Sequence, residues 1–573
     1  MEVLDHAFRE FAERPAVRLH AEASGTGRVD GGIGPVDGGT GRVRGGVRPA
    51  EEERQADAGP DGTSITWTYA ELDRRSRLAG WRLRAMGLRP GDRILTWSPS
   101  TPALPAAYIG AMRAGVIFVP LDLRMAPDAI HRIGEVAGVR ALVLGSGRDA
   151  PDPAAAGLEA LSIIPLDDLV AEPGPELPAD WAAQMAGWER PRPEDLVTLI
   201  FTSGTTGTPK GVMLAHNNLV AALGSYDRVL PRLEHRVVSL LPLSHLFELL
   251  VGLLYVLSVG ADVRYVQSRN PRVIFDALRR QRVTSMIAVP QILELFWTAV
   301  EREVDRIGRR RAFDRLRWLA RRLPASLRRR LFRSVHSQLG GGLRLFVCSG
   351  AFLPPAIQQA WEDLGVTVMQ GYGATETASG TCTTLQDHGI GTVGRPAAPV
   401  EIRLASDAEV LFRGPTLFKG YWNNPEATAA AFDEEGWYHS GDMGRFDAQG
   451  RLILMGRKRD MIVLSNGLNV FPEDVENTLR MAGIHDAILV EPRPGRLEAV
   501  VLAGEADGEV GDEQRARLGA MVKAANARLG QHQRVDGWRL WPEPDFPRTH
   551  TLKVKRAPIA EWAAAQAAAE RPG

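Results

Sequence analysis

Residues 198–216 read TLIFTSGTTGTPKGVMLAH. An apolar, strand-like run from Leu196 to Phe201 leads into a loop of glycine and hydroxyl side chains, and a helix-like stretch, Asn217 to Leu223, follows it. Glycine lets backbone N–H groups converge on one point, where hydroxyls and an ammonium group can also donate hydrogen bonds. An oligophosphate needs this set of donors. The stretch therefore predicts a phosphate-binding loop formed by Thr202, Ser203, Gly204, Thr205, Thr206, Gly207 and Lys210.

This loop differs from a Walker A loop, in which glycine and lysine are adjacent and a serine or threonine follows. Here Lys210 lies between Pro209 and Gly211. A flexible Gly/Thr linker is the alternative interpretation. It is disfavoured because linkers rarely follow a buried strand or end in a fixed Pro-Lys-Gly sequence.

The composition limits the functional classes. The chain has 573 residues, enough for several domains, and its formal net charge of +0 implies no overall attraction to nucleic acid. Its two cysteines are too few for a disulfide framework. The longest apolar stretch, 246–259, is short for a membrane span and contains Glu248, so it predicts a buried helix. We expect a cytoplasmic protein, either free or peripheral at the inner face of the membrane.

The chain divides into unlike segments. Residues 21–63 are rich in Gly, Arg, Asp and Pro without an apolar period, which predicts a disordered insertion. From 65 to 190, strand-like and helix-like runs alternate. This alternation predicts an α/β fold of parallel sheets with helices on both faces.

Two further features leave alternatives open. His245, in PLSHLFELL, follows a strand-like run, where α/β proteins place ligands, and it is equally well explained as a capping or core histidine.

Residues 302–333 are rich in arginine with interleaved apolar residues. A solvated amphipathic helix pair is the favoured interpretation, and a membrane-surface patch is the second. Nucleic acid is not expected as a partner, because no nucleic-acid-binding motif accompanies the patch.

Two acidic residues occupy loops that follow strand-like runs. Glu376 is the only carboxylate in VMQGYGATETAS (368–379), and Asp442 lies in GWYHSGDMG (436–444). A hard divalent cation prefers oxygen ligands, so Glu376 and Thr206 are predicted to hold Mg²⁺ beside a triphosphate. The Asp442 carboxylate can accept both hydroxyls of a ribose, and Arg457 can donate to the same sugar. The alternatives are an exposed turn acid and a surface hairpin charge.

These motifs, with SGAFLPP (349–355) and FPRTHTLKVKRAPI (546–559), resemble the adenylate-forming enzymes, which include acyl-CoA synthetases, firefly luciferases and peptide-synthetase adenylation domains. The resemblance covers about 65 to 560. It implies α/β layers of parallel and mixed sheets with a β-barrel-like part in a domain at 1–458. A small mobile α+β domain at 459–573 would carry the catalytic lysine, with the hinge at Arg459.

The resemblance also assigns residues. Lys553 aligns with the catalytic lysine, although Leu552 stands where glycine is common. His245 would line the acyl pocket. The catalytic set would be Lys553, Thr206, Glu376 and His245. Beyond the phosphate loop, the nucleotide would contact Gly350, Ala351, Gln370, Gly371, Tyr372, Gly373, Thr375, Asp442 and Arg457.

The segment at 302–345 and the TLKVKR form resemble the long-chain fatty acyl-CoA synthetases in particular. This implies that a fatty carboxylate and ATP give acyl-AMP, and that coenzyme A then takes the acyl group. An acyl-AMP ligase that loads an acyl carrier protein is the nearest alternative. A non-catalytic acyl- or nucleotide-binding protein and an activator of aryl or amino acids are more distant.

Overall fold

A six-stranded sheet follows the first helices of the chain. The computed structural model describes residues 1–20, 65–146, 151–172, 177–202, 209–268, 270–464, 468–484, 486–502, 512–548 and 554–570. The strands, in the order β6-β5-β3-β4-β7-β8, are β3 (Arg93–Trp97), β4 (Ile117–Leu121), β5 (Ala141–Leu144), β6 (Ser162–Pro165), β7 (Leu196–Thr202) and β8 (Lys210–Ala215). All pairs are parallel except β7 with β8. Every residue of β4 is buried, as expected for a strand covered by helices on both faces.

A second sheet has nine of the described strands in the order β15-β14-β13-β12-β11-β9-β10-β1-β2. They are β1 (Pro15–Leu19), β2 (Thr66–Thr68), β9 (Arg236–Ser239), β10 (Asp262–Tyr265), β11 (Ser285–Ala288), β12 (Leu345–Cys348), β13 (Thr367–Tyr372), β14 (Thr381–Cys382) and β15 (Arg395–Pro396). Its interior pairs are parallel, whereas β2, β14 and β15 are antiparallel to their neighbours. The α/β alternation predicted from the sequence is therefore confirmed.

An antiparallel sheet joins these two. It contains β16 (Glu401–Leu404), β17 (Glu409–Arg413), β18 (Tyr438–Phe446) and β19 (Leu452–Arg457). Backbone hydrogen bonds connect the chain between its strands to β8: the Met213 N–H donates to the Gly420 carbonyl at 3.0 Å, and the Trp422 N–H donates to the Gly211 carbonyl at 2.8 Å. These bonds hold the residues near 420 against the end of the six-stranded sheet.

The described helices cover the sheets. They are α1 (Glu2–Glu10), α3 (Tyr69–Ala85), α4 (Ala103–Ala114), α5 (Pro127–Ala137), α6 (Leu166–Val170), α7 (Trp181–Ala186), α8 (His216–Val229), α10 (Pro271–Gln281), α11 (Pro290–Arg306), α15 (Pro355–Asp363) and α16 (Pro425–Ala430). Helices α3 and α4 approach closely at two glycines: a Cβ on Gly110 would lie 2.6 Å from the Ser76 carbonyl oxygen, and one on Gly80 would lie 2.8 Å from the Gly110 carbonyl oxygen. Only glycine permits this spacing.

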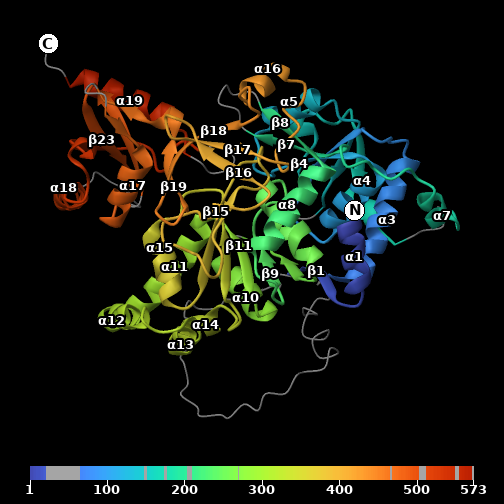
Figure 1. Cartoon of the computed structure of the whole chain (residues 1–573), viewed down its shortest axis with the longest axis horizontal. Helices are drawn as coiled ribbons and strands as arrows, with labels where there is room; N and C mark the ends of the chain where they lie inside the picture. Colours follow the sequence, from blue (N-terminus) through green and yellow to red (C-terminus); the bar gives the residue numbers. More distant parts are fainter. Residues whose placement is uncertain are drawn as a thin grey trace, which may run out of the picture.

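The C-terminal part has its own elements and apolar clusters. It contains β20 (Ile462–Val463), β21 (Asn469–Val470), α17 (Pro472–Met481), β22 (Ala487–Arg493), β23 (Arg496–Val501), α18 (Asp512–Asn526), β24 (Gly537–Leu540) and α19 (Arg556–Ala569). One cluster centres on Val475 and Leu479, and another centres on Val500 and Ile559. Figure 1 shows these elements, in orange and red, at one side of the molecule.

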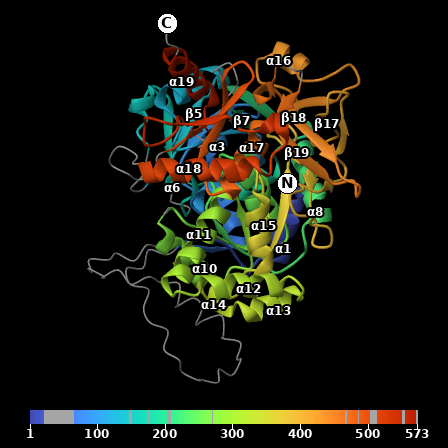
Figure 2. The ribbon, with the colours of Figure 1, turned by 90° about the vertical axis from the view of Figure 1, so that its left-hand side faces the viewer.

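Three short helices form one end of the molecule. Figures 1 and 2 both place α12 (Arg310–Ala320), α13 (Ala325–Leu331) and α14 (Arg333–Gln338) together, at the end opposite α16 and α19. The predicted amphipathic pair at 302–333 is thus a set of short helices that continues from α11. Phe313 and Leu316 pack toward the interior, whereas Trp318 is 55% exposed.

The apolar stretch at 246–259 is a buried helix, as predicted, with an unusual geometry. A π-helix, Glu248–Tyr255, runs into the short α9 (Val256–Ser258). The Glu248 side chain is fully buried, and its Oε1 accepts a hydrogen bond from the Ser239 hydroxyl at 2.6 Å. Burial raises the pKa of Glu248 to about 8. Among the described residues, no helix has both the length and the apolar character needed to cross a membrane.

Glu248 makes stability depend on pH. Its pKa is about 8 in the folded chain and near the ordinary 4.5 in the unfolded chain, so unfolding between these values releases a proton. Stability should therefore fall as pH rises through this window, by up to about 1.4 kcal/mol per pH unit from this one group. Denaturant titrations at several pH values should show that Glu248→Gln loses this contribution.

The exposed Glu426, on α16, provides the control: Glu426→Gln should keep the parent pH dependence. An identical pH dependence in Glu248→Gln and the parent protein would contradict the assignment.

Candidate active site

A buried carboxylate joins the nine-stranded and four-stranded sheets. The Tyr372 hydroxyl, at the end of β13, donates to Asp442 Oδ2 at 2.6 Å. Arg457 Nε lies 2.7 Å from Asp442 Oδ1, and the two residues are cross-strand partners on β18 and β19. The three side chains that were predicted to bind a nucleotide's base and sugar therefore meet at one point.

The loops around this point are exposed. Gly350, with a φ of +89°, and Ala351 follow β12 and are exposed, as is Gly373 after β13. The positive φ at Gly350 is one that residues with a Cβ rarely adopt. Gln370 differs from its neighbours, since its Nε2 donates to Gln358 Oε1 on α15 at 2.8 Å. Its side chain is engaged in the interior, and its predicted contact with a nucleotide stays a prediction.

Glu376 lies between the two halves of the site. Its Oε1 accepts a hydrogen bond from the Tyr421 hydroxyl at 3.0 Å, and the Lys210 ammonium lies 5.0 Å from the centre of the Tyr421 ring. Burial raises the pKa of Glu376 above its ordinary value, against the opposing influence of Tyr421 and of the charges of Arg457 and Lys210. A cation at the carboxylate would reverse this effect.

The phosphate-loop sequence joins two antiparallel strands. Thr202 and Lys210 are paired across β7 and β8, so the ends of the loop are held together. The helix predicted at Asn217–Leu223 is confirmed, since these residues lie within α8, and the strand β8 stands between the loop and this helix. Residues 203–208, including Ser203, Gly204, Thr205, Thr206 and Gly207, lie outside the described residues.

His245 contacts a carboxylate that sequence reasoning did not select. Its Nε2 lies 3.3 Å from Oδ2 of Asp122, which follows β4. Arg124 Nη2 lies 2.6 Å from the same carboxylate. Although burial opposes it, the hydrogen bonds of Arg124 and His245 hold the pKa of Asp122 well below its ordinary value. Asp122 thus fixes the orientation of His245 and remains ionised.

The sugar end of the site adjoins the predicted hinge. Lys458 directly follows Arg457, and its Nζ lies 2.6 Å from Asp407 Oδ2 and 2.9 Å from Glu409 Oε2. Arg459 has 59% of its side chain exposed. Helix α17 packs against β19 in the region of Gly456 and Glu473 (Figure 1). The chain is therefore anchored before Arg459 by ion pairs, and the C-terminal elements touch the site immediately after it.

The segments on either side of Lys553 make hydrogen bonds with each other and with α17. Lys553 itself lies outside the described residues. Arg548 and Val554 form an antiparallel bridge, and the Lys555 N–H donates to the Pro547 carbonyl at 2.7 Å. Arg556 makes two hydrogen bonds to Glu476, at 2.7 and 2.6 Å. These contacts join the two flanks to each other and attach the second flank to α17.

The sequence profile described as AMP-binding enzyme matches residues 48–422, about two-thirds of the chain. The chain belongs to the AMP-binding enzyme family.

Two relatives of this chain are named as acid–CoA ligases. Feruloyl-CoA synthase of an Amycolatopsis species is 31% identical over 81% of this chain and 90% of its own length. The long-chain-fatty-acid–CoA ligase FadD15 of Mycobacterium bovis is 28% identical over 87% of this chain and 91% of its own length.

The fold is shared with solved structures of the same kind. The anthranilate CoA ligase AuaEII, in complex with anthranoyl-AMP, matches with a TM-score of 0.73, covers 99% of this chain and 97% of its own, and is 19% identical. The o-succinylbenzoate CoA synthetase MenE of Bacillus subtilis, with its acyl-adenylate, matches with a TM-score of 0.71 over 97% of both chains at 20% identity. The predicted adenylate-forming fold is therefore confirmed.

Sequence reasoning missed residues that position the predicted ones. Tyr421 engages Glu376, and Asp122 with Arg124 engages His245. Asp122 directly follows the apolar run of β4, and an acid at the carboxyl end of a parallel strand is a usable signal. Tyr421 gave no comparable signal, since its role depends on the hydrogen bonds between β8 and the residues near 420.

The Asp442 contact can be tested with nucleotide analogues. If the carboxylate accepts the ribose hydroxyls, the protein should bind AMP more tightly than 2′-deoxy-AMP, and Asp442→Asn should lose most of this preference. The expected loss of AMP affinity is roughly 10- to 100-fold, as for other hydrogen bonds to a charged group. Isothermal titration calorimetry of both ligands against both proteins measures this.

Asp407→Asn, at the exposed partner of Lys458, is the matched control and should keep the preference for AMP. An unchanged preference in Asp442→Asn would remove Asp442 from the sugar site.

Proposed function

We propose that this chain is an ATP-dependent fatty acid–CoA ligase that works in two steps. A carboxylate and ATP give acyl-AMP and pyrophosphate, and coenzyme A then gives acyl-CoA and AMP. The observation that carries the proposal is the meeting of Tyr372, Asp442 and Arg457 beside Glu376 and Lys210 in an AMP-binding family chain. The similarity to a long-chain ligase over 87% of the chain supports it.

In the first step, a carboxylate oxygen attacks the α-phosphorus of ATP, and the bond to the β-phosphate breaks. Charge spreads over phosphoryl oxygens, so positioning and electrostatic stabilisation supply most of the catalysis. Asp442 would hold the ribose, Tyr372 would lie against the base, and Lys210 with the phosphate loop would bind the leaving pyrophosphate. Lys553 would lie between the carboxylate and the α-phosphate.

Glu376 is suited to a magnesium site. Its carboxylate has a pKa raised by burial, which a divalent cation would offset, and no group of three His, Cys, Asp or Glu that could hold a metal occurs among the described residues. Magnesium often uses one or two carboxylates and completes its shell with substrate phosphates and water. Glu376 and Thr206 would hold Mg²⁺, which supplies charge neutralisation for the phosphates.

In the second step, the thiol of coenzyme A attacks the acyl carbon and AMP leaves. The residues 459–573 would act as a mobile domain that turns at Arg459, withdraws Lys553 and presents residues 465–470 to the pantetheine. The ion pairs of Lys458 fix the chain before this point. Hinges are commonly a few residues between two anchored segments.

The acyl group is proposed to be a fatty chain that lies beside the buried helix at 248–258. That helix is apolar apart from Glu248, Tyr255 and Ser258, and the pKa of about 8 keeps Glu248 protonated near neutral pH. His245 stands at its start. The feruloyl-CoA synthase relative makes an aromatic carboxylate the second candidate. Either acid would present its carboxylate at the same point.

The acyl acceptor separates the two principal candidates. No additional segment occurs in the sequence between Arg457 and Glu476, where an insertion would restrict rotation. This favours coenzyme A over an acyl carrier protein.

Contact with a membrane surface is a separate proposal, supported by the exposed Trp318, Leu319 and Leu327 on α12 and α13.

A product assay tests the function. Purified protein with MgATP would receive a series of fatty acids and ferulic acid, with and without coenzyme A, and mass spectrometry would follow the products. Acyl-CoA formed only with coenzyme A, and with fatty acids preferred, is the expected result. Acyl-AMP that accumulates despite coenzyme A would favour the carrier-protein ligase. No AMP with any acid would overturn the proposal.

The two steps can be separated at Lys553. Lys553→Ala should lower the rate of adenylate formation by about 10²–10³-fold, because a cation at the transition state is lost. Conversion of supplied acyl-AMP and coenzyme A to acyl-CoA should persist. Single-turnover assays of each half-reaction measure this, with Lys555→Ala as the control expected to retain both. Equal loss in both halves would contradict the assignment.

A further inference from the structure

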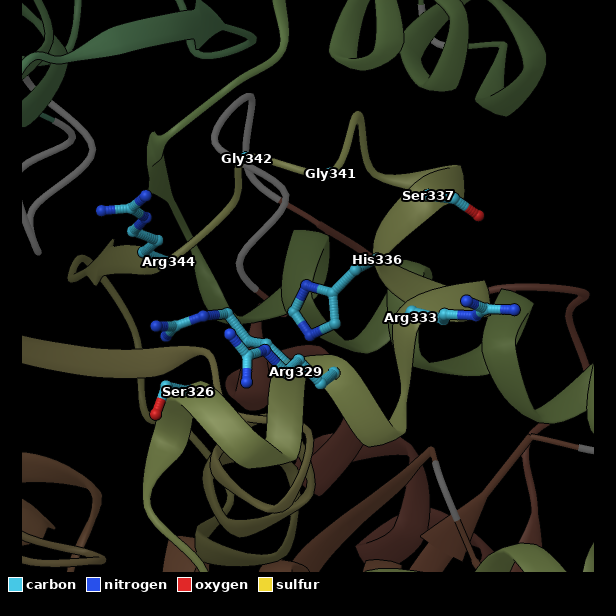
Figure 3. A pocket seen from close by; sticks show the side chains of 9 residues that line it. Ser326, Arg329, Arg333, His336, Ser337, Gly341, Gly342 and Arg344 are labelled. Atoms are coloured by element: carbon cyan, nitrogen blue, oxygen red, sulfur yellow. The ribbon is translucent and has the colours of Figure 1, made fainter. Parts of the chain in front are cut away.

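A pocket with many arginines lies at the end of the molecule formed by α12, α13 and α14. Its volume is about 410 Å³, and α13, α14, the glycine turn at 340–342 and the chain before β12 line it. Its charged side chains are Arg329, Arg330, Arg333 and Arg344, without a carboxylate among the lining residues. In Figure 3 the His336 ring lies at the centre of this set, with Arg329 below it and the Gly341–Gly342 turn above it.

Among the described residues the pocket arginines have no acidic partners, unlike three arginines in or next to α12. Arg310 pairs with Glu301, and Arg317 and Arg321 both pair with Asp363. Within the part of the chain that the structure describes, no carboxylate forms an ion pair with any of the four pocket arginines. The pocket therefore has an excess of positive charge that the protein leaves unbalanced.

The position of Arg329 is fixed despite this excess. Its Nη1 donates to the Gly365 carbonyl at 3.0 Å, which ties α13 to the turn before β13. Burial and the neighbouring charge of Arg344 both lower the pKa of Arg329. An anion between the two guanidinium groups would relieve this repulsion.

One ring nitrogen of His336, Nδ1, has no hydrogen-bond partner among the described residues. Its side chain is 5% exposed, and its Nε2 lies 2.9 Å from the Leu364 carbonyl oxygen, which can only accept a hydrogen bond. Nε2 therefore carries a hydrogen. Nδ1 is buried. Burial lowers the pKa of His336, so near neutral pH the ring carries no charge and the positive charge of the pocket comes from its arginines.

The pocket is separate from the candidate active site. Arg344 precedes β12, whereas Gly350 follows it, so the two sites lie at opposite ends of this strand. The glycine turn that closes the pocket is tightly constrained: Gly340 has a φ of +83°, and a Cβ on Gly342 would lie 2.7 Å from the Arg282 carbonyl oxygen. A residue with a Cβ is therefore disfavoured at both positions of this wall.

We propose that this pocket is a binding site for a phosphate group, supplied by a soluble phosphate ester or by a phospholipid headgroup. Guanidinium groups bind phosphate oxygens through paired, charge-assisted hydrogen bonds, and the pocket offers several of them around one space. The volume accommodates a phosphate ester larger than the phosphate ion.

The test compares two double variants of the full-length protein. Arg330→Gln/Arg333→Gln removes two charges from the pocket. Arg132→Gln/Arg272→Gln removes two charges from exposed positions on α5 and α10, so it has the same net charge. Glycerol phosphate binding is measured by calorimetry. Binding to phosphatidylcholine vesicles, with and without phosphatidylglycerol, is measured by sedimentation.

The pocket variant should lose affinity for one of these two probes by about tenfold or more, which corresponds to about 1.4 kcal/mol, whereas the control variant should keep it. Loss for glycerol phosphate identifies a soluble ester as the ligand, and loss for phosphatidylglycerol vesicles alone identifies the headgroup. Equal losses in both double variants, or no binding of either probe by the parent protein, would overturn the proposal.

Arg344→Gln, on the chain before β12, provides a second variant that leaves α13 and α14 unchanged and should show the same loss. ATP–pyrophosphate exchange, measured in parallel, should be equal in all four proteins, since the pocket lies away from the candidate active site. Failure of the phosphate proposal is thereby distinguished from failure of the proposed ligase function.

Discussion

The carboxylate of Asp442 is the point on which the arrangement of the site depends. It is 7% exposed, and a buried carboxylate is stable only when charged or hydrogen-bonded partners replace water. Tyr372 supplies a hydroxyl from the nine-stranded sheet, and Arg457 supplies a guanidinium from the neighbouring strand. One ion therefore fixes the relative position of two sheets at the place where the predicted base and sugar contacts converge.

The same cluster connects the site to the C-terminal elements. Arg457 ends β19, and Lys458 pairs with Glu409 of β17 and with Asp407 just before that strand. Helix α17 packs against β19 directly beyond the linker. The groups that would hold the nucleotide sugar and those that would set the position of the C-terminal part are thus neighbours in sequence and in space. A ligand bound at Asp442 would therefore lie beside Arg457, two residues before the proposed hinge.

A net charge of zero conceals an uneven distribution. On α12, Arg310 pairs with an acid of α11 and Arg317 pairs with an acid of α15, and Arg317 also covers the ring of Trp297. Around the pocket of α13 and α14 the charges have no such partners. The net charge sums over the α12 arginines and the pocket arginines. It therefore shows neither the packing role of the α12 arginines nor the unpaired charge of the pocket arginines.

The sequence by itself determined the α/β class, the family and the order of the motifs, because these depend on local patterns: apolar runs that become buried strands, glycine loops after them, and acids at strand ends. The buried helix at 246–259 was predicted for the same reason. Only the tertiary structure decided that β8 separates the phosphate loop from α8, that Gln370 faces α15, and that Tyr421 and Asp122 support Glu376 and His245. The contacts of Tyr421 and Asp122 join residues 45 and 123 positions apart in the chain, and which distant side chains meet is set by how the sheets pack, which no local pattern encodes.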